Sequence, residues 1–453
     1  MSKRIIIIGG GPAGIEAARA AVKAGGEVTL VSEELIGGRS GWHSLLPSKV
    51  WLTIADTAGL IAKNPFNNKQ KLPAPSTILR HLQHIKEQWN AQQEANLKAL
   101  GVNIVIGVAM FVAANSIMVK NTEKRYETTL TGDAIILAPG SAPFFPPNLR
   151  PDGKKIIAPR FLSGLKKLPT SVAVIGAGAT GTEIVYLFNR MGVDVTWVVD
   201  KFGVLPAFSP VIGDMLADIL VKRNVNLMRV DLADHFEYEG DEVAVIMSDG
   251  MQKKAAMVFV AIGRFPDLKR LNLEAAGLTV TERQHIETNQ FCQTTISGIY
   301  AVGDAAGPPM LANRAMAMAR VAGFHAAGSE VAPFNPNTVI SAVYCEPQVA
   351  QVGAMTSDDE SIRTTRVSFS SVMKTHLLSE PEGFLELAFN RTGKITGGVA
   401  VGHHAGDVLA PVALAIKIEA TLNDMASIFA AHPTLSELAF VAARESQYSE
   451  LRN

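Results

Sequence analysis

Two glycine-rich segments have the residue types and spacing that suit a nucleotide diphosphate. They are Gly9-x-Gly11-Pro12-Ala13-Gly14 and Gly176-x-Gly178-x-x-Gly181. In such a loop the first glycine permits a tight turn and the second lets the backbone approach a diphosphate. The third lets the following helix pack against a strand. The first turn of that helix then offers free N–H groups and a positive dipole end to the phosphates.

An acidic residue follows each loop at the distance expected for ribose recognition. Glu33 stands 19 residues after Gly14 and is predicted to bind a ribose hydroxyl. Asp200 closes the second unit, where a carboxylate favours NAD because it repels the 2′-phosphate of NADP. Lys201 beside it would tolerate that phosphate, so NADP stays open as the alternative.

The elements that must position these residues repeat along the first half of the chain. Apolar runs at 4–8 and 172–175 lead into the loops, helical patterns follow, and second apolar runs precede Glu33 and Asp200. Two such β–loop–α–β units predict two parallel-sheet nucleotide domains. Residues 76–100 read as an amphipathic helix capped by Ser76, with Ile78, Leu82, Ile85 and Trp89 on one side. From about residue 332 strand-like runs predict a separate α+β domain.

The overall composition excludes several classes of partner. Lys plus Arg and Asp plus Glu both number 42, so the formal net charge is zero. That balance gives no footprint for nucleic acid or an anionic membrane surface. No apolar run is long enough for a signal-peptide core or a bilayer span. We therefore expect a cytoplasmic protein without an integral membrane segment.

Three further motifs make a family resemblance specific. They are Gly303-Asp304 after a strand-like run, Leu137-Ala-Pro-Gly140-Ser141, and Ala261-Ile-Gly263-Arg264. With the two glycine loops, they make the chain resemble the flavoprotein pyridine nucleotide–disulfide oxidoreductases, the group of dihydrolipoamide dehydrogenase, glutathione reductase and mercuric reductase. The resemblance covers nearly the whole chain. It implies an α/β fold with two Rossmann-like domains, for FAD (1–147 and 270–332) and NAD(P) (148–269), and an α+β dimerisation domain (333–453).

The resemblance also implies roles for particular residues around the flavin. Gly303 and Asp304 would bind the ribityl chain of FAD, and Gly140, Gly263 and Arg264 belong to the cofactor-binding motifs. Met310, Leu311 and Ala312 match the start of a helix whose N-terminus points at the flavin pyrimidine edge, where a positive dipole stabilises reduced flavin. Lys49 matches the lysine near flavin N5, and Glu183 matches its ion-pair partner.

The segment from Ala431 to Glu437 matches the family's catalytic dyad motif. In the family, His432 would reach the flavin site of the partner subunit, oriented by Glu437, and act as an acid and base toward a thiol. Because each site would then use both chains, the resemblance implies a homodimer.

The chain departs from the family where the redox disulfide should lie. The stretch from Gly37 to Lys49 has Ser40 and Leu45 at the two cysteine positions, and neither side chain can form a disulfide. The two cysteines of the chain, Cys292 and Cys345, stand elsewhere, without metal-ligand spacing. We expect both to be buried small hydrophobes, and we expect no metal site.

This departure leaves the role of the neighbouring residues open. His432 either protonates a different acceptor or packs the dimer interface. Arg39, Trp42 and His43 lie where the family's disulfide helix begins. They would hold a planar or anionic acceptor, or Trp42 would simply fill the space left by the disulfide.

The sequence therefore predicts an FAD-dependent NAD(P)H:acceptor oxidoreductase. Hydride would pass from the nicotinamide to the flavin and then directly to a small acceptor, such as a quinone, another electrophile or a metal ion. One alternative is a soluble pyridine-nucleotide transhydrogenase. Another is a non-turnover FAD protein acting as a structural or redox-sensing partner, although the second glycine loop, Lys49 and Glu183 argue against a pure scaffold.

Overall fold

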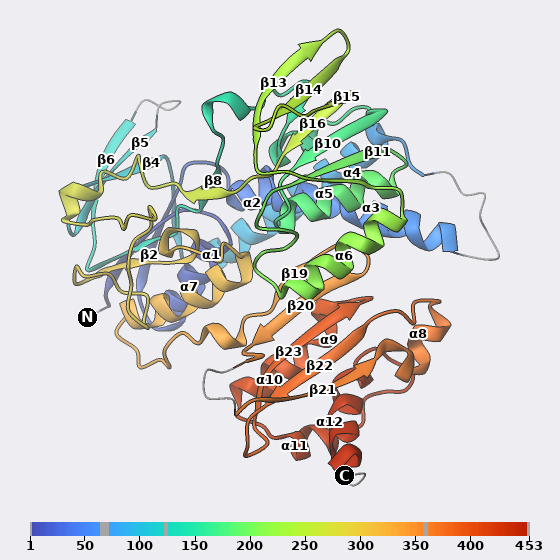
Figure 1. Ribbon diagram of the computed structural model, residues 1–453. Helices are drawn as coiled ribbons and strands as arrows, with labels where there is room; N and C mark the ends of the chain where they lie inside the picture. The colour runs from blue at the N-terminus through green and yellow to red at the C-terminus, as the bar shows by residue number, and fades with distance from the viewer. Residues whose placement is uncertain (1, 64–71, 122–125, 357–360, 451–453) are drawn as a thin grey trace.

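The computed structural model describes residues 2–63, 72–121, 126–356 and 361–450. Three five-stranded sheets organise this part of the chain, one after another from the N-terminus. In Figure 1 the first sheet lies at the left, the second at the upper right, and the third below them with the C-terminus. The predicted α/β class, with two Rossmann-type units and a C-terminal α+β domain, is confirmed.

The first sheet is parallel and has the strand order β18-β7-β1-β2-β3. Ile5 to Ile8 are at most 5% exposed, so the central strand is covered on both faces, as in doubly wound folds. Helices α1 and α7 pack against each other beside this sheet (Figure 1). The elements are β1 (Arg4–Ile8), α1 (Pro12–Lys23), β2 (Glu27–Ser32), β3 (Asn103–Ile106), β7 (Ala134–Leu137), β18 (Ile299–Ala301) and α7 (Ala312–Ala326).

The second sheet repeats this design with the order β12-β11-β10-β16-β9, again parallel. Val172 to Ile175 are at most 4% exposed, so its central strand is also fully buried. The elements are β9 (Ile156–Ile157), β10 (Ser171–Ile175), α5 (Ala179–Arg190), β11 (Asp194–Val199), α6 (Pro210–Lys222), β12 (Asn226–Arg229) and β16 (Met257–Val260).

The third sheet is antiparallel, with the order β19-β20-β23-β22-β21. Its strands are β19 (Ser341–Val343), β20 (Gln348–Gly353), β21 (Arg363–Ser368), β22 (Phe384–Phe389) and β23 (Ile395–Gly402). The helices of this part are α8 (Met373–Leu377), α9 (Ala405–Val408), α10 (Ala410–Lys417), α11 (Leu422–Ala426) and α12 (Glu437–Glu450). The strands of the three sheets fall inside the three predicted domains, and the exact domain boundaries stay predictions.

Three smaller sheets complete the described strands. A two-stranded sheet pairs β8 with β17 antiparallel, next to the connection between the first two domains. The strands are β4 (Val108–Ala113), β5 (Ser116–Asn121), β6 (Tyr126–Thr131), β8 (Ser141–Pro143), β13 (Ala233–Glu239), β14 (Glu242–Met247), β15 (Gln252–Ala255) and β17 (Arg264–Pro266). Within the described ranges, no helix is both long and apolar enough to cross a membrane.

Helix α3 (Leu45–Lys63) joins the first domain to the second. It follows the short helix α2 (Gly38–Trp42) and packs on α5. Trp51 is fully buried in the core that α3 shares with α5, and its indole N–H donates to the Leu162 carbonyl at 3.0 Å. A shared core of this kind fixes how α3 and α5 face each other, and therefore where their polar side chains meet.

Helix α4 (Pro75–Ala99) corrects two sequence predictions. It begins at Pro75 with Ala74 as its N-cap, so Ser76 is not the cap, because proline is favoured in the first helical turn. The predicted apolar side continues through Ile78 and Leu82 to Ile85, which is partly buried against the core. Beyond it the buried positions are Lys86, Asn90, Gln93 and Leu97, while Trp89 is 54% exposed. Contact with α1, α2 and α3 decides which side is buried.

Candidate functional site

The two glycine loops have the same backbone construction. Gly9 and Gly176 have φ of 117° and 104°, a conformation open to glycine at little cost. A Cβ on Gly14 would lie 1.8 Å from the Gly9 oxygen, and one on Gly181 would lie 2.0 Å from the Gly176 oxygen. Both third glycines are therefore required by the close approach of helix and strand.

The middle glycines face open space instead. A Cβ on Gly11 or Gly178 would meet no described atom within 4 Å. These two glycines are also the N-caps of α1 and α5, and within the described residues neither helix start has a side-chain cap. Open space beside uncapped backbone amides fits a diphosphate at each loop, so both loops suit a dinucleotide. Pro12 contributes no amide but holds the first helical turn, and Ala13 follows it.

The two predicted ribose carboxylates have different surroundings. Arg270 donates to both oxygens of Glu33, at 2.5 and 2.6 Å, and these bonds hold the pKa of Glu33 below its ordinary value. Asp200 lies after β11 and accepts a hydrogen bond from the Phe202 amide at 3.0 Å. Lys201 is exposed beside it. Glu33 is thus already paired with a cation, a partner that its sequence spacing did not reveal.

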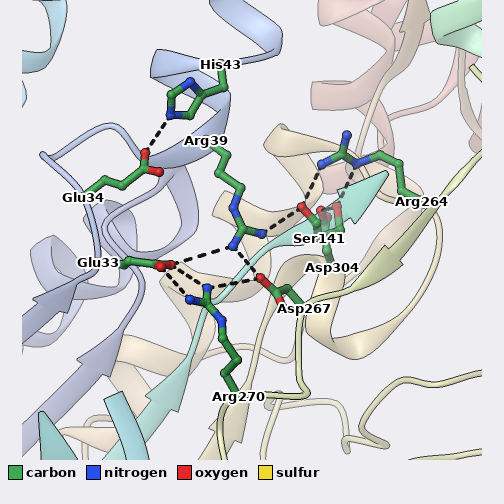
Figure 2. Close-up of polar contacts among 9 residues, drawn as sticks. All are labelled: Glu33, Glu34, Arg39, His43, Ser141, Arg264, Asp267, Arg270 and Asp304. Carbon is green, nitrogen blue, oxygen red and sulfur yellow. Dashed lines mark hydrogen bonds and ion pairs between the residues drawn. The ribbon is translucent and has the colours of Figure 1, made fainter. Parts of the chain in front are cut away.

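The motifs around Gly140, Arg264 and Asp304 meet at one residue. Ser141 donates through Oγ to Asp304 Oδ2 at 2.5 Å and accepts from Arg264 Nε at 2.8 Å (Figure 2). Arg264 also donates to the Ser141 carbonyl at 2.8 Å. Burial lowers the pKa of Arg264, although nearby Asp304 acts in the opposite direction.

The glycines beside these residues leave room or allow close packing. A Cβ would meet open space at Gly140 and Gly263, which have φ of 72° and 132°. A Cβ on Gly303 would come within 2.7 Å of Ala315 Cβ and 3.9 Å of Ala13 Cβ. Gly303 and Asp304 therefore lie beside the first turn of α1.

Helix α7 starts where the resemblance predicts. Leu311 is its N-cap and Ala312 its first residue, so Met310 immediately precedes the cap. Leu311 cannot cap with its side chain, and the described part of the chain supplies no other side-chain cap at this end. The first amides of α7 are therefore available to an electron-rich group.

Lys49 and Glu183 meet across the boundary between the first two domains. Lys49 Nζ lies 2.7 Å from both oxygens of Glu183, whose side chain is only 9% exposed. The Tyr344 amide donates to Glu183 Oε1 at 3.1 Å, and the Tyr344 ring centroid lies 4.3 Å from Lys49 Nζ. Tyr344, which the sequence reasoning missed, thus completes this group from the third domain.

The side chains of the segment that stands in place of the redox disulfide form contacts within the chain. Ser40 directs Oγ to the Gly37 carbonyl at 3.4 Å, and Leu45, at the start of α3, is 43% exposed. Trp42 donates its indole N–H to the Ile36 carbonyl at 3.0 Å, with Lys86 Nζ 5.5 Å from its ring centroid. His43 pairs with Glu34 at 2.9 Å. Trp42 and His43 are therefore held by protein contacts.

Both cysteines are buried, as expected. Cys292 is 1% exposed in the core of the first domain, and burial raises the pKa of its thiol to about 12. Cys345 is also 1% exposed; burial raises its thiol pKa, and its Sγ lies 3.1 Å from the Pro347 carbonyl oxygen. Neither thiol forms a ready thiolate.

His432 and Glu437 form the predicted pair. His432 Nδ1 lies 2.9 Å from Glu437 Oε1, and the Thr434 amide donates to Glu437 Oε2 at 2.8 Å. Burial acts to raise the pKa of Glu437, but these hydrogen bonds outweigh it and hold that pKa below its usual value. Within one chain, no contact among the described residues joins this pair to Lys49 and Glu183.

Comparisons with known proteins agree with this arrangement. The family model described as pyridine nucleotide-disulphide oxidoreductase matches residues 3–319, and that of its dimerisation domain matches residues 339–443. Dihydrolipoyl dehydrogenase of Chlorobaculum parvum is 32% identical, over 99% of this chain and 97% of its own. An NAD(P)H dehydrogenase (quinone) of Mycobacterium tuberculosis is 30% identical, over 98% and 94%. The crystal structure of M. tuberculosis LpdA superposes with a TM-score of 0.93 at 28% identity, over 98% of this chain and 99% of that one.

Proposed function

Because the chain belongs to the pyridine nucleotide-disulphide oxidoreductase family, we propose that this FAD-containing, NAD(P)H-dependent oxidoreductase reduces a small acceptor directly, without a dithiol relay. The observation that carries the proposal is the presence of Ser40 and Leu45 at the family's two cysteine positions. Neither residue supports thiol–disulfide exchange, and burial with a raised pKa keeps Cys292 and Cys345 out of it.

The proposed acceptor is a quinone or a similarly planar apolar molecule. Leu45 and Lys49 are four residues apart on α3 and share one face of the helix. Leu45 and Tyr344 are both 43% exposed, so an aliphatic and an aromatic surface lie close to the Lys49 ammonium. Apolar walls with one cationic group suit a planar acceptor whose oxygen gains electron density. The quinone-reducing relative supports the same acceptor class.

The residues of the chain bind and orient the reactants. Bound FAD would supply hydride acceptance from NAD(P)H and electron delivery to the acceptor. The loop at Gly11 would bind the FAD diphosphate and the loop at Gly178 that of the nicotinamide cofactor. Glu183 holds the Lys49 ammonium in place, and the Tyr344 ring covers one side of it. The uncapped start of α7 offers amides to developing negative charge.

We also propose that His432 of the partner subunit delivers a proton to the reduced acceptor. Glu437, as a carboxylate, accepts from His432 Nδ1, so the imidazolium form of His432 would carry a second proton on Nε2, give it to the acceptor and become the neutral ring. The His432 side chain is 59% exposed in the single chain, as expected of a group completing a neighbouring site. The family's dimerisation domain supports the homodimer that this role requires.

For the nicotinamide cofactor we propose NAD over NADP. The Asp200 carboxylate, held by the Phe202 amide, stands where a 2′-phosphate would meet negative charge. Lys201 is the residue that would moderate this preference.

A steady-state assay tests the proposal. NADH oxidation should be rapid with a water-soluble naphthoquinone and negligible with oxidised lipoamide, and a Cys292→Ser/Cys345→Ser variant should keep the quinone rate. Rapid lipoamide reduction that this variant loses would contradict the proposal. Rapid hydride exchange between NADPH and NAD, without quinone reduction, would instead identify a transhydrogenase. Retained FAD with no reduction by either nucleotide would identify the non-turnover protein.

A further inference from the structure

A cluster of alternating charges lies beside the first glycine loop, where the first domain meets the end of the segment assigned to the second. We call it the charge cluster; its members are Glu33, Arg39, Arg264, Asp267, Arg270 and Asp304 (Figure 2). Its three carboxylates and three guanidiniums balance in charge. Arg264 and Asp304 are linked through Ser141, and the other four form a connected group of ion pairs.

The backbone places this cluster directly at the FAD cradle. A Cβ on Gly38 would lie only 2.8 Å from Gly11 Cα, and the Gly37 amide donates to the Gly10 carbonyl at 2.9 Å. Arg39 is therefore the next residue after Gly38, whose backbone contacts Gly11, the middle glycine of the loop. Glu33 follows Ser32, whose Oγ would lie 2.3 Å from a Cβ on Gly10.

The three guanidiniums differ in how they are held. Arg264 is committed to Ser141, and Arg270 makes two hydrogen bonds to Glu33. Arg39 instead spans several acceptors: it pairs with Asp267, donates to the Ser141 carbonyl at 3.2 Å, and lies 3.8 Å from Glu33. Its side chain is one-third exposed, at 33%. Unlike Arg270, Arg39 is therefore not held by both oxygens of any one carboxylate, and it is the guanidinium whose backbone lies next to the glycine loop.

We propose that Arg39 binds the diphosphate of FAD and exchanges its carboxylate partners for it. A bound diphosphate would add about two negative charges to a cluster whose net charge is already zero. A guanidinium can donate to two phosphate oxygens in bidentate geometry. When Arg39 binds the diphosphate, Asp267 keeps Arg270 as its ion-pair partner. Glu33 no longer has Arg39 beside it and can bind the adenosine ribose. The inference rests on the proposed function only in requiring that the protein binds FAD. It assigns to Arg39 an FAD-positioning role at a site separate from the acceptor.

The test measures FAD binding and not turnover. Apoproteins of the wild type, Arg39→Gln, Arg39→Lys and His43→Gln are titrated with FAD, followed by quenching of flavin fluorescence, at several salt concentrations. His43→Gln is the matched control, because His43 lies in the same segment but pairs outward with Glu34. Thermal unfolding of each apoprotein checks that the variants are folded.

We expect Arg39→Gln to weaken FAD binding about 10- to 100-fold, the range for losing a charge-assisted contact, and to flatten its salt dependence. Arg39→Lys should fall between, and His43→Gln should match the wild type. If Arg39→Gln binds FAD like the wild type and with the same salt dependence, the proposal is wrong, although the protein still binds FAD. If the glutamine variant does not fold, the same comparison is made with Arg39→Lys. If the wild-type apoprotein takes up no FAD, both this inference and the proposed function are wrong.

Discussion

Lys49 and Glu183 stand at the contact of two domains, and their pairing buries a carboxylate. Removing Lys49 would leave Glu183, 9% exposed, with the Tyr344 amide as its one remaining hydrogen-bond donor among the described residues. An uncompensated buried charge is costly, so Lys49→Met should lower the free energy of unfolding by about 2 kcal/mol. The loss should be smaller in the Lys49→Met/Glu183→Gln double variant, measured by denaturant unfolding in a double-mutant cycle.

The same variant separates stability from function. We expect Lys49→Met to slow reduction of bound FAD by NADH about 100- to 1,000-fold, the range for removing one preorganised electrostatic contact from a reacting centre. Stopped-flow measurement of the flavin absorbance checks this rate. An unchanged rate would mean that the lysine only joins the domains.

Glu437 gives a prediction with a defined pH dependence. Its folded pKa lies below the ordinary 4.5, so its contribution to stability is complete above pH 4.5 and is lost as the pH falls through the folded pKa. Glu437→Gln should therefore be less stable than the wild type by about 1 kcal/mol at pH 7, and this difference should vanish at low pH. Thermal unfolding across pH 3 to 7 measures it, and a difference that grows toward low pH would contradict the account.

At the residue scale, the sequence indicated which residue types could do chemistry and how they are spaced, but it indicated few of their hydrogen-bond and ion-pair partners. The pairing of Lys49 with Glu183 and of His432 with Glu437 followed from family motifs. The pairing of Glu33 with Arg270 did not, because the two residues are 237 positions apart and neither motif contains the other. Tyr344 was missed for the same reason: its contact depends on how the third domain meets α3 and α5.

At the scale of elements, the glycine loops offer a matched pair of variants. Gly178 has φ of −70° and open space for a Cβ, so Gly178→Ala should fold normally but raise the KM for NADH about tenfold, by filling the diphosphate cradle. Gly181→Ala should instead destabilise the protein by about 2 kcal/mol or more, because its Cβ would meet the Gly176 oxygen. Unfolding curves and NADH saturation kinetics together test the pair. Equal effects on stability would contradict this division of roles.

Elements governed by local pattern were predictable, and those governed by packing were not. The strand-like runs expected after about residue 332 form the third sheet, and both parallel units appeared as expected. The buried side of α4 was wrong beyond Ile85, where polar Lys86 and Asn90 turn inward against the segment that includes Trp42. Apolar periodicity cannot reveal a buried side that is itself polar.

At the scale of the whole molecule, each active site should need two chains. Lys49→Met and His432→Gln homodimers should each be slow with the quinone. Subunits of the two variants mixed after dissociation should recover about a quarter of wild-type activity, because half of the dimers then hold one intact site. No recovery, with heterodimers verified by mass, would mean that His432 acts within its own chain or only packs the interface.

The central claim is that flavin is the only redox centre, and an anaerobic titration of the purified protein with NADH tests it most directly. The account predicts complete bleaching of the flavin absorbance at about one NADH per flavin, with no long-wavelength thiolate band at any point. Consumption of about two NADH per flavin, accompanied by that band, would reveal a redox-active dithiol and contradict the account.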